Sequence, residues 1–234
     1  MKIIIDNEYQ KYSDFICDIP RMIDAGEGEV IYDKRNKIVR FSHDNNIFIA
    51  KKYKKVNFIQ QIAYSFFCKT KAERAFEFAE RYKQLGIDTP QRIAYMEKKS
   101  MGMFSIGYFV SSESKGTECH LLLREVKDYD KDLALLVAKH IVLMHSKGIL
   151  HGDLNLSNFL YADGRLTMID INRTQFCDGM PSDEECMNNL VRLTHRRDLY
   201  ADIIRMYARI RGWNEDETAA KALKLLDRFE RKWL

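Results

Sequence analysis

The segment from Gly148 to Leu160 reads GILHGDLNLSNFL, and it decides the fold. It places His151, Asp153 and Asn158 in the pattern His-x-Asp-x-x-x-x-Asn. Phosphoryl transfer from ATP needs a carboxylate that accepts the proton of the attacking hydroxyl, and oxygen ligands that hold magnesium near the phosphates. Because this pattern carries a carboxylate and an amide on one loop, it predicts a phosphotransferase in which Asp153 meets the acceptor and Asn158 meets the metal.

A second carboxylate follows soon after this loop. Ala162–Arg165 is typical of a hairpin turn, Leu166–Ile169 is typical of a strand, and Asp170 ends that strand. Each piece alone is ordinary, since an aspartate after a strand is usually a turn residue and a lone His-x-Asp usually caps a loop. Together, their order and close spacing favour a kinase-like site over coincidence, and we expect Asp170 to bind magnesium together with Asn158.

The chain upstream of the loop is rich in strands and then turns helical. Residues 111–117 are small and polar, as in a linker, and the helix predicted over 131–147 is apolar on most sides, as buried helices are. We therefore predict an α+β, two-lobed fold: an N-terminal nucleotide-binding lobe (1–112) with an antiparallel sheet and one helix, and a mainly helical catalytic lobe (113–234). The N-terminal lobe is predicted from strands at 30–32, 38–41, 47–51, 93–96 and 106–110, and from a helix at 72–82.

A lysine that binds the nucleotide phosphates is expected at the end of the third strand. Lys51 follows an apolar triplet as the lysine does in the Val-Ala-Ile-Lys motif, whereas Lys52 matches if Ala50 faces the adenine. Side chains alternate across a strand, so one of the two faces the nucleotide, and we prefer Lys51. Its partner on the helix is Glu77 or Glu73, which lie one turn apart, with a slight preference for Glu77.

The phosphate-binding loop departs from a glycine-rich one. Gly26-Glu27-Gly28 has the composition of such a loop but precedes the first predicted strand. The turn between the first two strands, Asp33–Asn36, contains no glycine. Arg35 or Asn36 reaches the phosphates from this turn, or both are ordinary turn residues, and the sequence favours neither alternative.

The composition restricts the class of protein. The net charge is +4, a mild excess that fits an anionic substrate or membrane surface and does not call for nucleic acid as a partner. The five cysteines are odd in number and none form a Cys-x-x-Cys pair, which favours free thiols in a reducing compartment. The apolar stretches are too short to span a bilayer, so we expect a cytoplasmic protein.

Several segments taken together resemble the lipopolysaccharide kinase family, the Kdo/WaaP group, whose members are similar to protein kinases in fold. The resemblance covers roughly residues 25 to 195. It implies ATP and Mg²⁺ as cofactors and a hydroxyl of a lipopolysaccharide inner-core sugar, Kdo or heptose, as acceptor. The segments that carry it are Lys51-Lys52-Tyr53-Lys54, Lys71-Ala72-Glu73-Arg74, Gly86-Ile87-Asp88-Thr89-Pro90, His151–Asn158 and Ile169-Asp170-Ile171-Asn172-Arg173.

The resemblance also implies a role for each site residue. Asp153 is the catalytic base, His151 braces the loop, and Lys51 holds the α- and β-phosphates. Asn158 and Asp170 bind magnesium.

Two letters of the loop separate the chain from protein kinases. Gly152 stands where protein kinases have an arginine that reads activation-loop phosphorylation, and Asn155 stands where they have a lysine that assists peptide phosphorylation. The stretch between Asp170 and the next predicted helices is also short for a peptide-docking segment. These departures favour a small-molecule or glycan hydroxyl over a protein as acceptor.

A glycolipid acceptor implies peripheral contact with the anionic inner face of the cytoplasmic membrane. An amphipathic stripe near the C-terminus, which includes Ala222, Leu226 and Trp233, is expected to pack onto the second lobe rather than onto lipid. The alternatives to a lipopolysaccharide kinase are a kinase for another small molecule or a protein, and a pseudokinase or scaffold. Because the base, the metal ligands and a lysine are all present, the sequence disfavours the last.

Overall fold

The computed structural model of this chain describes residues 1–231 and divides into two compact units. Unit 1 comprises residues 1–84 and 89–114, and unit 2 comprises residues 85–88 and the chain from Lys115 onward. The sequence prediction placed the boundary between residues 112 and 113.

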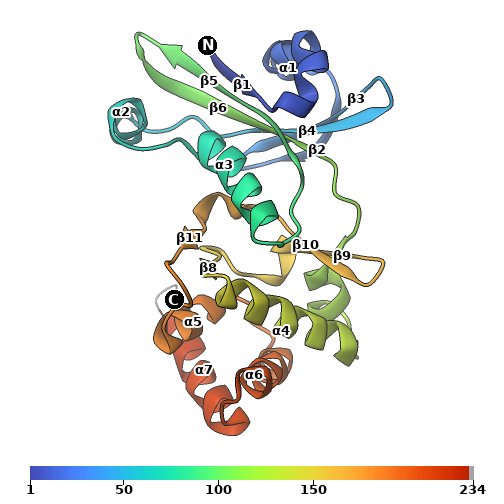
Figure 1. Cartoon of the computed structure of the whole chain (residues 1–234), viewed down its shortest axis with the longest axis vertical. Coiled ribbons are helices and arrows are strands. Elements are labelled where there is room, and N and C mark those ends of the chain that lie inside the picture. The colour runs from blue at the N-terminus through green and yellow to red at the C-terminus, as the bar shows by residue number, and fades with distance from the viewer. Residues whose placement is uncertain (232–234) are drawn as a thin grey trace. The chain divides into compact units, whose positions relative to one another are not determined.

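Unit 1 is built on a six-stranded antiparallel sheet in the order β1-β5-β6-β4-β3-β2 (Figure 1). Two-residue turns fix the register of its hairpins. Asp44 and Asn45 join β3 to β4, and Met101 and Gly102 join β5 to β6, all with positive φ, as tight hairpin turns require. The strands are β1 (Lys2–Ile5), β2 (Glu29–Asp33), β3 (Lys37–His43), β4 (Asn46–Lys52), β5 (Arg92–Ser100) and β6 (Met103–Ser112).

Helices cover both faces of this sheet. On α1 (Ser13–Ala25), Ile16, Ile19 and Ile23 recur at helical spacing and pack into the core on one face. On the other face, α3 (Lys71–Gln84) brings Ala72 and Phe76 to a second cluster that includes Tyr53, Tyr95 and Phe109 (Figure 1). The helix at 72–82 was predicted, whereas α1 and α2 (Phe58–Phe66) were not.

The glycines at 26 and 28 end α1 and allow a close approach to β3, instead of forming a turn between strands. Gly26 ends α1 in the left-handed conformation with φ of 79°. A Cβ at Gly28 would lie 2.6 Å from side-chain atoms of both Phe41 and Val39. The composition that suggested a phosphate loop therefore reflects a helix cap and a close approach to β3.

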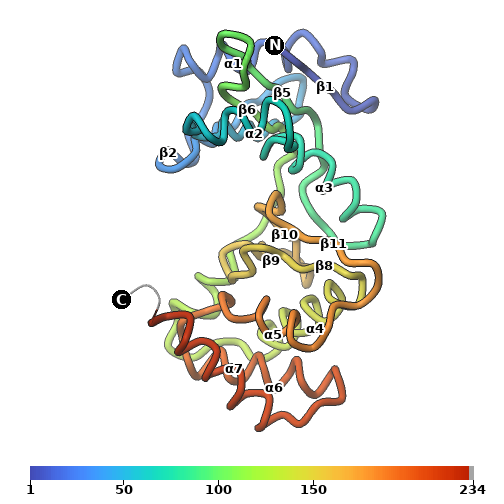
Figure 2. Tube along the Cα trace, turned by 90° about the vertical axis from the view of Figure 1, so that its left-hand side faces the viewer, coloured from blue at the N-terminus to red at the C-terminus, as the bar shows by residue number. Residues whose placement is uncertain are grey.

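Unit 2 is mainly helical, with a few short strands around the predicted catalytic loop. The helices α6 and α7 run side by side and α6 also packs on α4 (Figure 2). The helices are α4 (Lys131–Ser146), α5 (Asp183–Leu190), α6 (Arg197–Arg211) and α7 (Glu215–Glu230), and the strands are β7 (Thr117–Glu118), β8 (Ile149–Leu150), β9 (Phe159–Ala162), β10 (Arg165–Met168) and β11 (Gln175–Phe176). Shorter turns are η1 (Asn7–Tyr12, in unit 1), η2 (His120–Arg124), η3 (Leu156–Asn158) and η4 (Ile171–Arg173).

The central and terminal helices of unit 2 follow their sequence patterns. On α4, Val137, Ala138 and Ile141 are fully buried, as expected of a helix that is apolar on most sides. On α7, Ala222 and Leu226 are also fully buried. The predicted C-terminal stripe thus faces the interior of unit 2 over these positions, while its last member, Trp233, lies outside the described residues.

The fold prediction is confirmed in its class: an antiparallel sheet with helices is followed by a mainly helical unit with the hairpin β9–β10 where Asp163-Gly164 predicted it. Within residues 1–231, no helix combines the length and the apolar character that crossing a bilayer requires.

Candidate active site

Four of the predicted site residues lie in unit 2 on two adjoining segments. The loop after β8 carries three of them, and the segment after β10 carries the fourth. The hairpin β9–β10 pairs Phe159 with Met168, and the amide of Ile169 donates to the carbonyl oxygen of Asn158 at 3.0 Å. The ends of the two segments therefore lie together, and the residues that they bring close are His151, Asp153, Asn158 and Asp170.

His151 joins these two segments through both ring nitrogens. The ring is fully buried, Nδ1 accepts a hydrogen bond from the amide of Asp153 at 3.2 Å, and Nε2 lies 3.1 Å from the carbonyl oxygen of Ile169. Since Nδ1 is an acceptor, the proton is on Nε2, which donates to that carbonyl. Burial lowers the pKa of His151 below its ordinary value, so the ring is neutral near pH 7.

Asn158 holds the backbone of the same loop. Its Nδ2 donates to the carbonyl oxygen of Asp153 at 2.7 Å, and Asn155 Nδ2 reaches that carbonyl at 3.2 Å. Asn155 Oδ1 in turn accepts from the amide of Ser157 at 3.0 Å. Because the nitrogen of the Asn158 amide is engaged, its oxygen is the atom that remains to act as a metal ligand.

Asp170 adopts a left-handed conformation, with φ of 54°, at the start of η4. Few residues other than glycine, asparagine and aspartate accept this conformation. Its Oδ1 accepts a hydrogen bond from Nδ2 of the buried Asn172 at 2.7 Å, which orients the carboxylate.

The donors at Asn158 and Asp170 fit a hard cation. Both offer oxygen, and Mg²⁺ is typically held by one or two carboxylates together with phosphate oxygens rather than by an all-protein cage. Among the described residues, no group of three or more His, Cys, Asp or Glu side chains is placed to hold a metal. Two oxygen donors from the protein are within the number of protein ligands that Mg²⁺ usually takes.

Position 152 must be a glycine because no room is left there for a side chain. Its φ is not in the left-handed region, but a Cβ built on it would lie 2.3 Å from the carbonyl oxygen and 2.8 Å from Cβ of Arg173. Real Cβ atoms do not approach that closely, so the η4 segment packs directly on the loop only because position 152 has no side chain. Comparison with protein kinases marks this glycine as a replaced arginine, and the structure adds a steric reason for it.

Two arginines flank the carboxylate of Asp153, and the sequence prediction assigned a role to neither. Arg173 Nη1 lies 3.8 Å from Oδ2, and Arg192 Nη1 lies 3.6 Å from Oδ1. Arg192 also lies over the ring of Phe229, with 5.2 Å from Cζ to the ring centroid. Both arginine side chains are about half exposed, so they face solvent around the half-buried carboxylate.

A chain of hydrogen bonds supports the loop from inside unit 2. Arg211 Nη1 donates to the hydroxyl of Tyr207 at 2.7 Å, and this hydroxyl lies 2.8 Å from Nδ1 of His145. His145 Nε2 lies 3.2 Å from Asn189 Oδ1, and Asn189 Nδ2 donates to the carbonyl oxygen of His151 at 2.8 Å. Burial lowers the pKa of His145 to about 4, so a neutral ring accepts from Tyr207 and donates to Asn189.

In unit 1, the two candidate lysines point to opposite faces of the sheet. Lys52 forms an ion pair with Asp24 of α1. Lys51 pairs across the sheet with Phe109, a member of the cluster on the α3 face, and its Nζ lies 5.5 Å from the ring centroid of Tyr53. Lys51 is thus the lysine on the same face as the candidate glutamates.

The two candidate glutamates on α3 both contact lysines. Glu77 accepts from Lys69 with both carboxylate oxygens at 2.7 Å. Glu73 lies 3.2 Å from Lys2 Nζ and accepts from the hydroxyl of Tyr95 at 3.3 Å. The preference for Glu77 stays a prediction.

The turn between β2 and β3 contains the two candidate phosphate-loop residues. Arg35 is exposed. The side chain of Asn36 accepts from the amide of Lys54 at 3.2 Å, which ties the turn to the segment after β4. Asn36 therefore has a structural partner, and the roles of both residues toward phosphate stay predictions.

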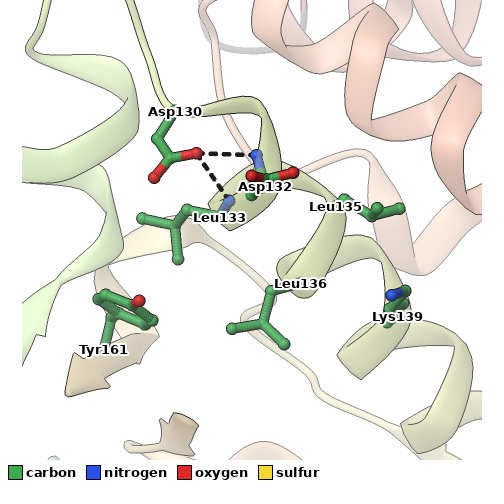
Figure 3. Close-up of a pocket in the computed structure, with 7 residues that line it drawn as sticks. All are labelled: Asp130, Asp132, Leu133, Leu135, Leu136, Lys139 and Tyr161. Atoms are coloured by element: carbon green, nitrogen blue, oxygen red, sulfur yellow. Dashed lines mark hydrogen bonds between the residues drawn. The ribbon is translucent and has the colours of Figure 1, made fainter. Parts of the chain in front are cut away.

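A pocket of about 250 Å³ lies along the first turns of α4 in unit 2 (Figure 3). Asp130 caps this helix through hydrogen bonds to the amides of Asp132 and Leu133, at 2.8 and 3.2 Å. The remaining lining residues are Leu135, Leu136, Lys139 and Tyr161. The predicted site residues are absent from this lining, so the pocket is separate from the catalytic loop.

Known proteins resemble the chain along most of its length. A solved structure described as WaaP in complex with acyl carrier protein superposes with a TM-score of 0.63 and 19% identity, covering 99% of this chain and 98% of that chain. The KEOPS complex subunit Bud32 of Pyrococcus abyssi (strain GE5 / Orsay) is 23% identical over 228 residues, which is 92% of this chain and 99% of that protein. The sequence model of the lipopolysaccharide kinase (Kdo/WaaP) family matches residues 32–220. Since this match spans well over half of its length, the chain belongs to the lipopolysaccharide kinase (Kdo/WaaP) family.

Proposed function

We propose that the protein transfers the γ-phosphate of ATP to a hydroxyl of a lipopolysaccharide inner-core sugar, Kdo or heptose, with Mg²⁺ as cofactor. Membership of a kinase family supports a phosphotransferase. The observation that carries the proposal is the loop of unit 2, where His151 and Asn158 fix the backbone on either side of Asp153. A carboxylate held in this way is suited to accept a proton from an alcohol.

Each residue has a defined task in the proposed reaction. Asp153 accepts the proton of the acceptor hydroxyl, which attacks the γ-phosphorus as the bond to the β-phosphate oxygen breaks. Asn158 and Asp170 hold Mg²⁺, which supplies positive charge against the phosphate oxygens. Lys51 of unit 1 binds the α- and β-phosphates, so unit 1 is the nucleotide-binding lobe and unit 2 the catalytic lobe.

The arginines beside Asp153 support an acidic acceptor. Two guanidinium groups within 4 Å of one carboxylate form a local positive patch at the solvent-exposed side of the base. Arginine binds carboxylates and phosphates with paired hydrogen bonds, so an acid group on the acceptor would find partners beside the reacting hydroxyl. Kdo is a sugar acid, and heptoses of the inner core qualify when phosphate groups are attached.

The partner and location follow from the acceptor. A lipid-linked sugar brings the enzyme to the cytoplasmic membrane, and we propose the inner face, where ATP is available. The solved WaaP structure contains acyl carrier protein, which makes a carrier protein a second candidate partner for this chain.

A panel of acceptors tests the function. Incubated with γ-labelled ATP and Mg²⁺, the protein is expected to label Kdo- or heptose-containing core oligosaccharide, and not aminoglycosides or model proteins. Labelling of a protein or an aminoglycoside instead of the core sugar would refute the proposal.

Arg192→Gln is expected to raise KM for an acidic acceptor about tenfold, as loss of a charged hydrogen bond does, while KM for ATP stays unchanged.

The two lysines of β4 provide a matched pair of variants. Lys51→Met is expected to lower kcat by about 10²-fold or more, since a cation that stabilises transferring phosphate is lost. Lys52→Met removes the ion pair with Asp24 and is expected to leave kcat near the wild-type value, at a cost of at most about 1 kcal/mol in stability. Steady-state kinetics and thermal unfolding measure both, and the reverse ranking would assign the phosphate contact to Lys52.

A further inference from the structure

The helix α2 presents an apolar surface that the protein itself does not cover. None of the nine residues of this fully described helix is buried. Phe58, Ile59 and Phe66 are 64%, 78% and 69% exposed, and Phe67, directly after the helix, is 81% exposed. Exposed aromatic side chains at this density on one short element are unusual for a surface that meets only water.

The opposite side of α2 is attached to the sheet. Ser65 Oγ accepts a hydrogen bond from the amide of Phe104 at 2.9 Å, and the rings of Tyr64 and Phe104 meet edge to face at 5.6 Å. Asn57 caps the first turn through the amide of Gln60 at 2.9 Å. The helix is therefore anchored, with Phe58, Ile59 and Phe66 projecting from a side that the sheet does not use.

Basic residues surround this apolar surface. The exposed Lys54 and Lys55 lie just before α2, and Lys69, which also pairs with Glu77, lies just after it. The segment from residue 53 to residue 72 contains no aspartate or glutamate. The end of the β5–β6 hairpin adds the exposed Lys98 and Lys99, and Lys99 pairs with Phe104, which contacts α2. At the tip of this hairpin, Met101 is 97% exposed.

We propose that α2 and the tip of the β5–β6 hairpin form a docking face for an anionic lipid bilayer. Aromatic side chains enter the boundary between headgroups and acyl chains, and lysines around them contact lipid phosphates. The inference deepens the membrane location given under the proposed function, but it is argued from α2 and its charges and not from the loop that carries Asp153.

The size and charge of the face favour lipid over a protein. A nine-residue helix is about 14 Å long and about 10 Å wide, so one side of it covers much less than the roughly 800 Å² that each partner buries in a stable protein interface. A second copy of this chain would bring its own lysines against these lysines. A bilayer supplies negative charge that complements the lysines and an apolar interior that accepts the exposed aromatic side chains.

The test uses the full-length protein and vesicles of phosphatidylcholine with or without phosphatidylglycerol. The wild type is expected to sediment with the anionic vesicles, and increasingly less as salt rises. Phe66→Ser combined with Phe67→Ser is expected to weaken this binding at least about tenfold, because two exposed aromatic rings are lost. Ile210→Ser, at an exposed apolar position on α6, is the matched control and should bind as the wild type does.

A second measurement keeps the result independent of folding defects. Trp placed by Phe67→Trp is expected to shift its emission to the blue when anionic vesicles are added, and Trp placed by Ile210→Trp is not. Phosphate transfer to a lipid-free core oligosaccharide should be equal in wild type and the Phe66/Phe67 variant. Failure of that transfer in the wild type would count against the proposed function alone.

Three outcomes would overturn the docking proposal. The first is equal vesicle binding by the wild type and the Phe66/Phe67 variant. The second is a dimer, seen by sedimentation equilibrium without lipid, that the same variant abolishes. The third is binding of acyl carrier protein through these side chains with no binding to vesicles.

Discussion

Asp153→Asn is expected to lower kcat for phosphate transfer by about 10²- to 10⁴-fold, the usual contribution of a general base. The amide has the shape of the carboxylate but does not accept the proton of the acceptor hydroxyl. The backbone of position 153 is held by His151 and Asn158, so the loop should keep its form. The measurement is kcat under saturating ATP and acceptor, together with the melting temperature.

Asp163→Asn is the control for this variant. Asp163 lies in the β9–β10 turn with φ of 48°, a conformation that asparagine also adopts. This change is expected to leave kcat unaltered. An Asp153→Asn enzyme as active as the wild type would remove Asp153 from the role of base.

Gly152→Ala should have the second large effect. The new Cβ would lie 2.3 Å from the carbonyl oxygen of Arg173, so the loop and the η4 segment must separate. Overpacking of this kind costs about 1–3 kcal/mol in stability. Because Asp170 is the residue directly before η4, this proposed metal ligand should move with the segment, and a displacement near 1 Å is expected to lower activity by about 10²-fold.

Gly164→Ala separates strain from crowding. Gly164 has φ of 76° with nothing within 4 Å of an added Cβ, so alanine brings conformational strain of about 1–2 kcal/mol and no collision. Its kcat is expected to equal that of the wild type. If Gly152→Ala lowers the melting temperature but keeps full activity, the close packing stabilises the fold and is not part of the site.

The sheet of unit 1 could be predicted because local signals agree there. β3 and β4 are short runs rich in apolar and β-branched residues on either side of the turn at Asp44 and Asn45, and the helix α3 has one apolar face. Helix α2 could not be predicted in the same way, since its apolar residues serve no internal core. Helix α1 is not predicted, because Gly26, which ends it, has the composition of a glycine-rich loop together with Gly28.

In the candidate site, too, some residues are marked by a local pattern and others are brought in only by packing. The spacing of His151, Asp153 and Asn158 is local, so the sequence indicates them directly. Asn189 and Arg192 reach the loop only through the packing of unit 2, about forty residues downstream, and no short motif marks them. The one available hint for Asn189 is its polarity within a short helix that also contains buried Met187 and Leu190.

The hydrogen bonds from Tyr207 through His145 and Asn189 to the carbonyl of His151 have a consequence for control. All the groups in this chain are present as soon as unit 2 folds. Protein kinases assemble their site in response to phosphorylation of the activation loop. The arginine that detects this phosphorylation in protein kinases is replaced here by Gly152. The hydrogen bonds that hold this loop therefore need no phosphorylated side chain in unit 2.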